Sequence, residues 1–310
     1  MYSLFDFGRM LTRPRVAAYT EAMRRAIRPG DVVVDIGTGT GFFALVAAKL
    51  GARKVYAIEG LAHAAELAKT TVRDNGFSDV IEVVHGLSTE LDLGEKADVV
   101  VADLRGKLPL FGANVPSMLD ARVRLLKPEG RLLPKRDRVY VCAFESDALY
   151  TYLLGGYEQP GFDLRACRAA VTQGMLNDDE RPLSAEQLVA EPALLFSVEY
   201  GTSPDRYKGK VTLTATRPAR VHGLVLWFDA EIDDDATFSN APGENVDVYG
   251  RVVFAWDVPL TVAPGENLDV EVLAHPVKDD YLWSVVTRTK DRLVRQSPLS
   301  LGNFEALRPK

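Results

Sequence analysis

Gly37, Gly39 and Gly41 follow a short apolar run with the spacing G-x-G-x-G, and two acids flank them. Asp35 precedes the first glycine by two residues, and Glu59 ends the next apolar run. Glycine permits positive φ angles and lets backbone amides approach a ligand more closely than any side chain would allow. A carboxylate at the end of the second strand is placed to accept hydrogen bonds from both hydroxyls of a ribose. These residues therefore predict a nucleotide-binding turn.

The glycine spacing and the charge of Asp35 narrow the choice of nucleotide. A dinucleotide fingerprint has its third glycine three residues after the second, whereas that position is Phe42 here. The carboxylate of Asp35 would repel a pyrophosphate, but it suits a ligand that carries an ammonium group and a sulfonium. We therefore expect S-adenosylmethionine as the ligand. An NAD-linked oxidoreductase and a tight strand–helix turn without a ligand are the alternatives.

The elements that position these residues follow an alternating α/β pattern from about residue 29 to residue 133, which is typical of a doubly wound, Rossmann-like sheet. The expected strands are 32–36, 54–58, 81–84, 97–102 and 131–133, and the expected helices are 42–50, 62–75 and 116–126. Connections between parallel strands are nearly always right-handed, so a ligand should lie beyond the carboxyl ends of the strands. Gly37, Glu59 and Asp103 would converge there.

After Pro134 the pattern changes to alternating strands separated by Gly, Pro, Asp and Asn turns, which predicts antiparallel structure. The expected strands are 196–200, 210–215, 220–229, 251–258, 268–274 and 281–287. Between the halves, residues 148–187 are partly helical and rich in aromatic and apolar side chains. Such a segment belongs either to the core or to a protein contact, and the sequence leaves both open.

Composition limits the classes of function. The chain has 310 residues and a net charge of -6, so a general electrostatic attraction to nucleic acid or to an anionic membrane is not expected. The N-terminus lacks the apolar core of a signal peptide, and no apolar run is long enough to span a bilayer, so a cytoplasmic location is the default expectation. Cys142 and Cys167 lack zinc-ligand spacing and the histidines form no His-x-x-x-His pair, so we expect no metal site.

Several segments together resemble the protein arginine methyltransferases over nearly the full length of the chain. Besides the glycine turn, they are Arg15 and Tyr19 at the spacing of the family's R-x-x-x-Y, residues 117–134, residues 161–163 and residues 222–232. The resemblance implies an α/β cofactor domain at 29–134 behind a helical lid at 1–28. It also implies a mainly antiparallel β-barrel at 135–310, with a dimerisation arm near 148–187 and a homodimer as the assembly.

The same resemblance implies the residues that contact S-adenosylmethionine. Arg15 would pair with the methionine carboxylate, Glu59 would bind the ribose, and Ser88 would flank the adenine. Asp35 would lie beneath the turn. The remaining expected cofactor residues are Gly37, Thr38, Gly39, Gly41 and Gly60.

The chain departs from the family at the segment expected to hold the methyl acceptor. The family grips a substrate guanidinium with two glutamates on the loop after the fourth strand, whereas here Asp103 takes the first position and no acid lies between Leu104 and Leu119. Arg105 and Lys107 are present instead. The family's Thr-His-Trp motif is also absent, because the chain reads DVYG at 247–250.

These features predict a methyltransferase whose acceptor is not an ordinary peptidyl arginine. An anionic or neutral small molecule, or a protein side chain other than arginine, would fit Arg105 and Lys107 better. Asp103 is the candidate for orienting the nucleophile or accepting its proton. Arg105 and Lys107 are tentative substrate contacts, with solvated loop residues as the equally weighted alternative. Because the second glutamate is missing, a catalytically silent, cofactor-binding dimeric scaffold is the alternative function.

Overall fold

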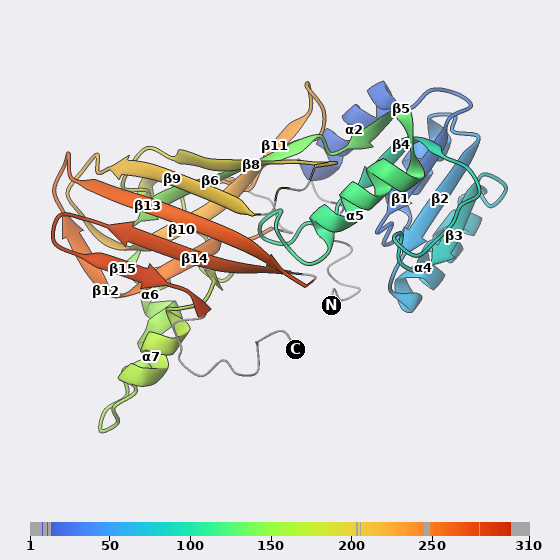
Figure 1. The fold of residues 1–310 in the computed structure, drawn as a ribbon. Helices are drawn as coiled ribbons and strands as arrows, with labels where there is room; N and C mark the ends of the chain where they lie inside the picture. The colour runs from blue at the N-terminus through green and yellow to red at the C-terminus, as the bar shows by residue number, and fades with distance from the viewer. Residues whose placement is uncertain are drawn as a thin grey trace.

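The computed structural model describes residues 8, 11, 14–202, 204, 206–244, 249–278 and 280–298. Figure 1 shows a parallel sheet with its helices on the right and two antiparallel sheets on the left. Most of the expected lid at 1–28 is described, from Pro14 onward, and its earlier residues apart from Gly8 and Leu11 lie outside the described part. The expected fold class, a doubly wound α/β domain followed by mainly antiparallel β structure, is confirmed.

The parallel sheet has the order β3-β2-β1-β4-β5, so its strand order reverses between β1 and β4. The strands are β1 (Val32–Ile36), β2 (Lys54–Glu59), β3 (Ile81–His85), β4 (Ala97–Ala102) and β5 (Leu126–Leu133). Every residue of β1 is buried, as expected for an apolar strand covered on both faces. The reversal places the carboxyl ends of β1 and β4 at the point where such sheets bind ligands.

Helices flank this sheet close to the predicted positions. They are α2 (Arg15–Ala26), α3 (Phe42–Lys49), α4 (Ala62–Asp74) and α5 (Asn114–Asp120). The predicted helix at 116–126 is α5 followed by a π-helical turn, Ala121–Leu125. β5 begins earlier than expected, because Leu126 pairs opposite Ala97 and Arg131 opposite Val99, so that the intervening Lys-Pro-Glu-Gly forms a bulge instead of ending the strand.

The second half forms two antiparallel sheets. A six-stranded sheet contains β6 (Arg136–Phe144), β7 (Leu176–Asn177), β8 (Ala193–Glu199), β10 (Ala219–Glu231), β11 (Thr237–Ser239) and β12 (Val252–Val262). A four-stranded sheet contains β9 (Tyr207–Thr214), β13 (Asn267–Val277), β14 (Asp280–Arg288) and β15 (Leu293–Gln296). Within the described residues the strand pairing does not close these sheets into one barrel.

β6 lies beside β10 within the six-stranded sheet, yet it was not among the predicted strands. Its first three residues, Arg136, Asp137 and Arg138, are charged, and such residues are unfavourable signals for a strand. Asp137 is nevertheless fully buried. A strand that begins with a buried carboxylate requires a partner for that charge, and the partner comes from the parallel sheet domain.

The aromatic segment expected near 148–187 contributes both to the core and to a projecting arm. α6 (Asp147–Leu154) and α7 (Arg165–Val171) extend away from the antiparallel sheets in Figure 1. Tyr150 is buried at the base of the arm, whereas Tyr152 and Phe162 are 52% and 75% exposed. The arm therefore presents aromatic surface that the described chain does not cover.

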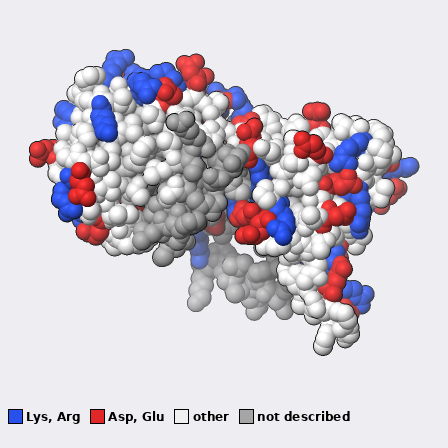
Figure 2. Space-filling view, turned by 180° about the vertical axis from the view of Figure 1, so that it is seen from behind, with Lys and Arg blue, Asp and Glu red and all other residues white. Residues whose placement is uncertain are grey.

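Charges of both signs are interspersed on the face shown in Figure 2. Acidic and basic side chains of the described residues form many local pairs, such as Lys54 with Glu82 and Arg136 with Glu231. None of the helices in the described residues is both long and apolar enough to cross a membrane.

Gly223 in β10 provides a test of the sheet packing. A Cβ atom at this position would lie 2.2 Å from the carbonyl oxygen of Phe254 and 2.9 Å from Cα of Ala255. Because backbone cannot move aside as a side chain can, Gly223→Ala should lower the free energy of unfolding by about 1–3 kcal/mol in a denaturant titration. Gly156→Ala in the arm, where nothing lies within 4 Å of the added carbon, is the control. Equal effects of the two substitutions would contradict this packing.

Candidate active site

A cavity opens beyond the carboxyl ends of β1, β2 and β4, where the sequence predicts convergence of the site residues. Gly37, Glu59 and Asp103 line it together. Arg15 of α2 forms another part of its wall, and Tyr249, immediately before β12, approaches from the antiparallel half of the molecule. The cavity is thus built by both halves of the chain.

The glycine turn is fixed to the neighbouring strand through its backbone. The N–H groups of Gly37 and Thr38 donate to the carbonyl oxygen of Ile58 at 2.8 and 3.0 Å. Gly37, Gly39 and Gly41 have φ angles of +72°, +57° and +86°, which L-amino acids with side chains rarely adopt. The spacing of the glycines therefore follows from the backbone path around the cavity.

Glu59 is held at the cavity wall by two backbone donors. Its Oε2 accepts from the N–H of Gly39 and its Oε1 from the N–H of Leu61, both at 2.9 Å. The residue is 8% exposed. Its carboxylate orientation is therefore set by the glycine turn on one side and by the start of α4 on the other.

Asp35 lies beneath the glycine turn and is 2% exposed. Its Oδ2 accepts from the hydroxyl of Thr38 at 2.6 Å. Burial raises the pKa of Asp35 to about 6, although hydrogen bonds from Thr38 and from the backbone of Ala44 oppose this effect. The ionised form is thus costly in the folded protein unless a positive charge lies nearby.

Three of the expected cofactor residues lie outside the cavity lining that the described residues form: Gly41, Gly60 and Ser88. Gly41 caps the start of α3 and packs against Ala68 of α4. Ser88 is buried, and its carbonyl oxygen accepts from Arg124. Their contacts with a cofactor stay predictions.

Arg15 and Tyr19 of α2 both reach the end of β4. Arg15 Nε donates to Asp103 Oδ2, and the guanidinium lies 5.2 Å from the ring centre of Phe43. The hydroxyl of Tyr19 donates to the carbonyl oxygen of Ala102 at 2.8 Å. The R-x-x-x-Y spacing therefore places two polar side chains, one helical turn apart, against the same strand end.

Asp103 accepts hydrogen bonds from three side chains. Tyr249 donates to its Oδ2 at 2.6 Å, in addition to Arg15, and Arg105 Nη1 donates to its Oδ1 at 2.8 Å. Burial alone would raise the pKa of Asp103, but the charges of Arg15 and Arg105 and the hydrogen bond from Tyr249 outweigh it and lower the pKa. Asp103 is therefore an ionised, weakly basic group, suited to orienting a neighbour more than to accepting a proton.

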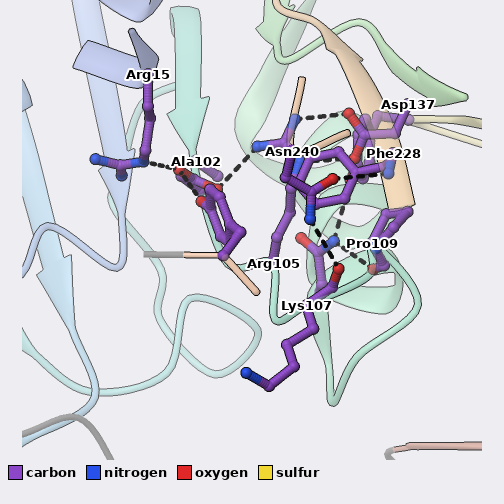
Figure 3. Close-up of polar contacts among 12 residues, drawn as sticks. Arg15, Ala102, Arg105, Lys107, Pro109, Asp137, Phe228 and Asn240 are labelled. Atoms are coloured by element: carbon purple, nitrogen blue, oxygen red, sulfur yellow. Dashed lines mark hydrogen bonds and ion pairs between the residues drawn. The ribbon is translucent and has the colours of Figure 1, made fainter. Parts of the chain in front are cut away.

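Arg105 connects the two halves of the molecule. It binds Asp137 of β6 in a two-pronged contact, with Nε to Oδ2 at 2.6 Å and Nη2 to Oδ1 at 2.8 Å (Figure 3). Arg105 is 2% exposed, and the hydroxyl of Tyr200 donates to Asp137 Oδ2 at 2.6 Å. The solvated alternative for Arg105 is therefore wrong, because the side chain is buried and pairs with an acid more than 30 residues away. Arg105 also lines the cavity, and a contact with substrate stays a prediction.

Lys107 lies outside the cavity lining of the described residues. Figure 3 shows its side chain pointing away from Arg105, and its ammonium group pairs with Asp179 at the surface. A role in substrate binding stays a prediction for this residue.

The sequence reasoning missed two residues of the site, Asp137 and Tyr249. A charged triplet at the start of a strand was the available signal for Asp137. Tyr249 lies within the Asp-Val-Tyr-Gly stretch that replaces the Thr-His-Trp motif, and residues 247 and 248 fall outside the described part. Burial raises the pKa of Tyr249, so its hydroxyl remains a proton donor to Asp103.

The raised pKa of Asp35 gives a pH-dependent prediction. The folded-state pKa of about 6 exceeds the ordinary value of 3.8, so the unfolded chain releases this proton first and stability falls as the pH rises through that interval. Asp35→Asn removes the titration, and the variant should gain up to about 3 kcal/mol relative to the wild type between about pH 4 and pH 7. Denaturant titrations of the cofactor-free protein at several pH values measure the difference. Asp74→Asn, at an exposed acid, is the control for removing one negative charge, and a constant difference for Asp35→Asn would refute the assignment.

Two family models match the chain, one on each side of the junction between β5 and β6. The model described as ribosomal protein L11 methyltransferase (PrmA) matches residues 16–133. The model described as arginine methyltransferase oligomerization subdomain matches residues 135–283.

Curated relatives are similar over most of the chain. Arginine N(omega)-methyltransferase of Streptomyces achromogenes subsp. streptozoticus is 31% identical over 245 residues, covering 77% of this chain and 67% of the relative. Probable protein arginine N-methyltransferase 6 of Arabidopsis thaliana is 28% identical over 241 residues, covering 75% of this chain and 54% of the relative. The chain spans about half the length of most of the curated relatives it matches.

Solved structures share the fold. The Trypanosoma brucei PRMT1 enzyme–prozyme heterotetrameric complex with AdoHcy superposes with a TM-score of 0.81 at 23% identity, covering 91% of this chain and 93% of that chain. Arabidopsis thaliana protein arginine methyltransferase 10 superposes with a TM-score of 0.78 at 22% identity, covering 95% and 96%. These superpositions show the fold. The 31% identity to the Streptomyces relative, over 67% of its length, shows that the chain belongs to the protein arginine methyltransferase family.

Proposed function

We propose that the protein is an S-adenosylmethionine-dependent methyltransferase. The observation that carries the proposal is the Glu59 carboxylate, which the N–H groups of Gly39 and Leu61 fix at the cavity wall beside the glycine turn. A carboxylate in this position accepts hydrogen bonds from ribose hydroxyls and disfavours a 2′-phosphate. The solved relative from Trypanosoma brucei contains AdoHcy, which supports the same class of ligand.

The charged groups of the cavity fit the other parts of this cofactor. Arg15 offers a guanidinium for a carboxylate, and the buried Asp35 favours a ligand that carries positive charge. When bound, S-adenosylmethionine supplies the methyl group on a sulfonium. Gly60 and Ser88 are proposed to contact the cofactor, with Ser88 beside the adenine, as the family resemblance implies.

Methyl transfer from a sulfonium is an in-line displacement, so positioning of the acceptor dominates the contribution of the protein. Asp103 is the proposed orienting residue, because it lines the cavity and its carboxylate is ionised. Tyr249 and Arg105 hold that carboxylate from two other elements. The acceptor thus meets a fixed hydrogen-bond acceptor in place of a mobile base.

Calorimetry with S-adenosylhomocysteine and with NADH tests the proposal. The wild type should bind S-adenosylhomocysteine, and Glu59→Gln should weaken binding about tenfold or more, because charge-assisted hydrogen bonds are lost. Asp103→Asn should keep cofactor affinity within a few-fold but remove transfer from labelled cofactor to pools of proteins and metabolites. Binding of NADH alone would refute the proposal. Cofactor binding without labelled product from any pool would favour the silent scaffold.

We also propose that the arm formed by α6 and α7 carries a homodimer contact, and that the protein is cytoplasmic. The matched family model for residues 135–283 describes an oligomerization subdomain, and the relative from Trypanosoma brucei forms a heterotetramer. In this chain, Tyr152 and Phe162 supply exposed aromatic surface on the arm.

Light scattering at micromolar concentration tests the arm contact. The double variant Tyr152→Ser/Phe162→Ser should shift the protein from dimer to monomer, because it removes apolar surface from the contact. Val123→Ser, at a residue that is 68% exposed on the parallel-sheet domain, is the matched control and should leave the dimer intact. A wild type that is monomeric would contradict the contact.

A further inference from the structure

The guanidinium of Arg105 lies in a cage of aromatic rings and carboxylates. Its Cζ is 5.6–5.9 Å from the ring centres of Tyr19, Tyr200, Phe228 and Phe238. Asp137 binds it through two parallel hydrogen bonds, and Asp103 binds it through a third. A two-pronged carboxylate contact and aromatic faces are the groups that recognise a guanidinium in proteins.

This guanidinium cage, formed by the four rings with Asp103 and Asp137, adjoins the cofactor cavity. Asp103 belongs to both, and Arg105 itself lines the cavity. Two further hydrogen bonds hold the cage in place. Asn114 donates to the hydroxyl of Tyr200 at 3.1 Å, and Tyr200 donates to Asp137. Moving the Arg105 side chain out of the cage would therefore leave the buried carboxylate of Asp137 without its guanidinium partner.

We propose that Arg105 determines acceptor specificity, because its guanidinium permanently fills the cage beside the cavity. The acceptor is therefore an uncharged or anionic group and not a guanidinium. This inference rests on the proposed methyltransferase function and specifies the acceptor class for the same site.

The charges of the cavity support this exclusion. Asp35 is bound by Thr38, Glu59 by two backbone N–H groups, and Asp103 by Arg15, Arg105 and Tyr249. Among these acids, only Asp103 is already paired with two guanidinium groups, so it offers no unpaired charge to a guanidinium acceptor.

The buried charges next to Asp103 also balance. Arg15 and Arg105 carry two positive charges, and Asp103 and Asp137 carry two negative ones. A guanidinium acceptor would add an uncompensated positive charge beside Arg105 in a buried site. An uncharged or anionic acceptor avoids that repulsion.

The first experiment titrates wild-type protein, saturated with S-adenosylhomocysteine, with L-arginine and with N-acetylarginine amide. No binding is expected at micromolar to low millimolar concentrations, and labelled S-adenosylmethionine should transfer no methyl group to either compound. Binding or methylation of either compound by the wild type would overturn the proposal.

The second experiment empties the cage with Arg105→Ala and adds ethylguanidinium, which replaces the atoms that the substitution removes. The variant should bind ethylguanidinium at least tenfold more tightly than the wild type, with a rise in Tm that ethylammonium does not produce. Lys107→Ala, which removes a cation from the same loop but leaves the cage filled, is the matched control and should gain no such binding.

Different outcomes test the filled cage and the methyltransferase function. An Arg105→Ala variant that retains S-adenosylhomocysteine binding but gains no affinity for ethylguanidinium would refute the cage. If that variant does not fold, the titration of the wild type with L-arginine and N-acetylarginine amide still decides the proposal. Arg105→Lys keeps the positive charge but loses the two-pronged contact, and it should fold with a lower Tm than the wild type. Failure of the wild type to bind S-adenosylhomocysteine would instead refute the methyltransferase function.

Discussion

The arrangement of the molecule depends on a buried arginine that stands between two carboxylates. Arg105 binds Asp103 at the end of the parallel sheet and Asp137 at the start of the antiparallel structure. Removing ionised groups from water is costly, and only close pairing offsets the cost. Without Arg105, Asp137 would lose its guanidinium partner and Asp103 would lose one of two, so the same contact that joins the two halves also fixes the wall of the cavity.

The buried ion pairs extend from Arg105 through Asp103 to Arg15. Arg15 shares Asp103 with Arg105 and Tyr249, so a residue of α2 that lines the cavity and a residue from the antiparallel half meet on one carboxylate. Both sheets must therefore be in place before Asp103 has its full set of partners. The contacts of Asp103 therefore join the antiparallel half of this chain to the wall of the cavity.

Local sequence patterns predicted the parallel sheet well, but they predicted poorly the junction between the parallel sheet and the antiparallel half, which lies between β5 and β6. β1 and β4 have the expected bounds, because each is an apolar run buried on both faces. β5 begins earlier than expected, because a bulge absorbs its proline and glycine. β6 was missed because its first three residues are charged. Asp137 among them pairs with Arg105 from another element, and the sequence of the strand does not show that contact.

The sequence by itself determined the glycine turn and the place of Glu59 beside it. Asp35, the glycines and Glu59 lie within one strand–turn–helix–strand unit, so their spacing reports a geometry that the local backbone enforces. Only the tertiary structure decided the balance of charge around Asp103. The sequence shows two cations after Asp103 and no second acid, whereas the fold brings Asp137 from β6 to Arg105 and balances the site. Such compensation acts between residues distant in the chain, and no local pattern records it.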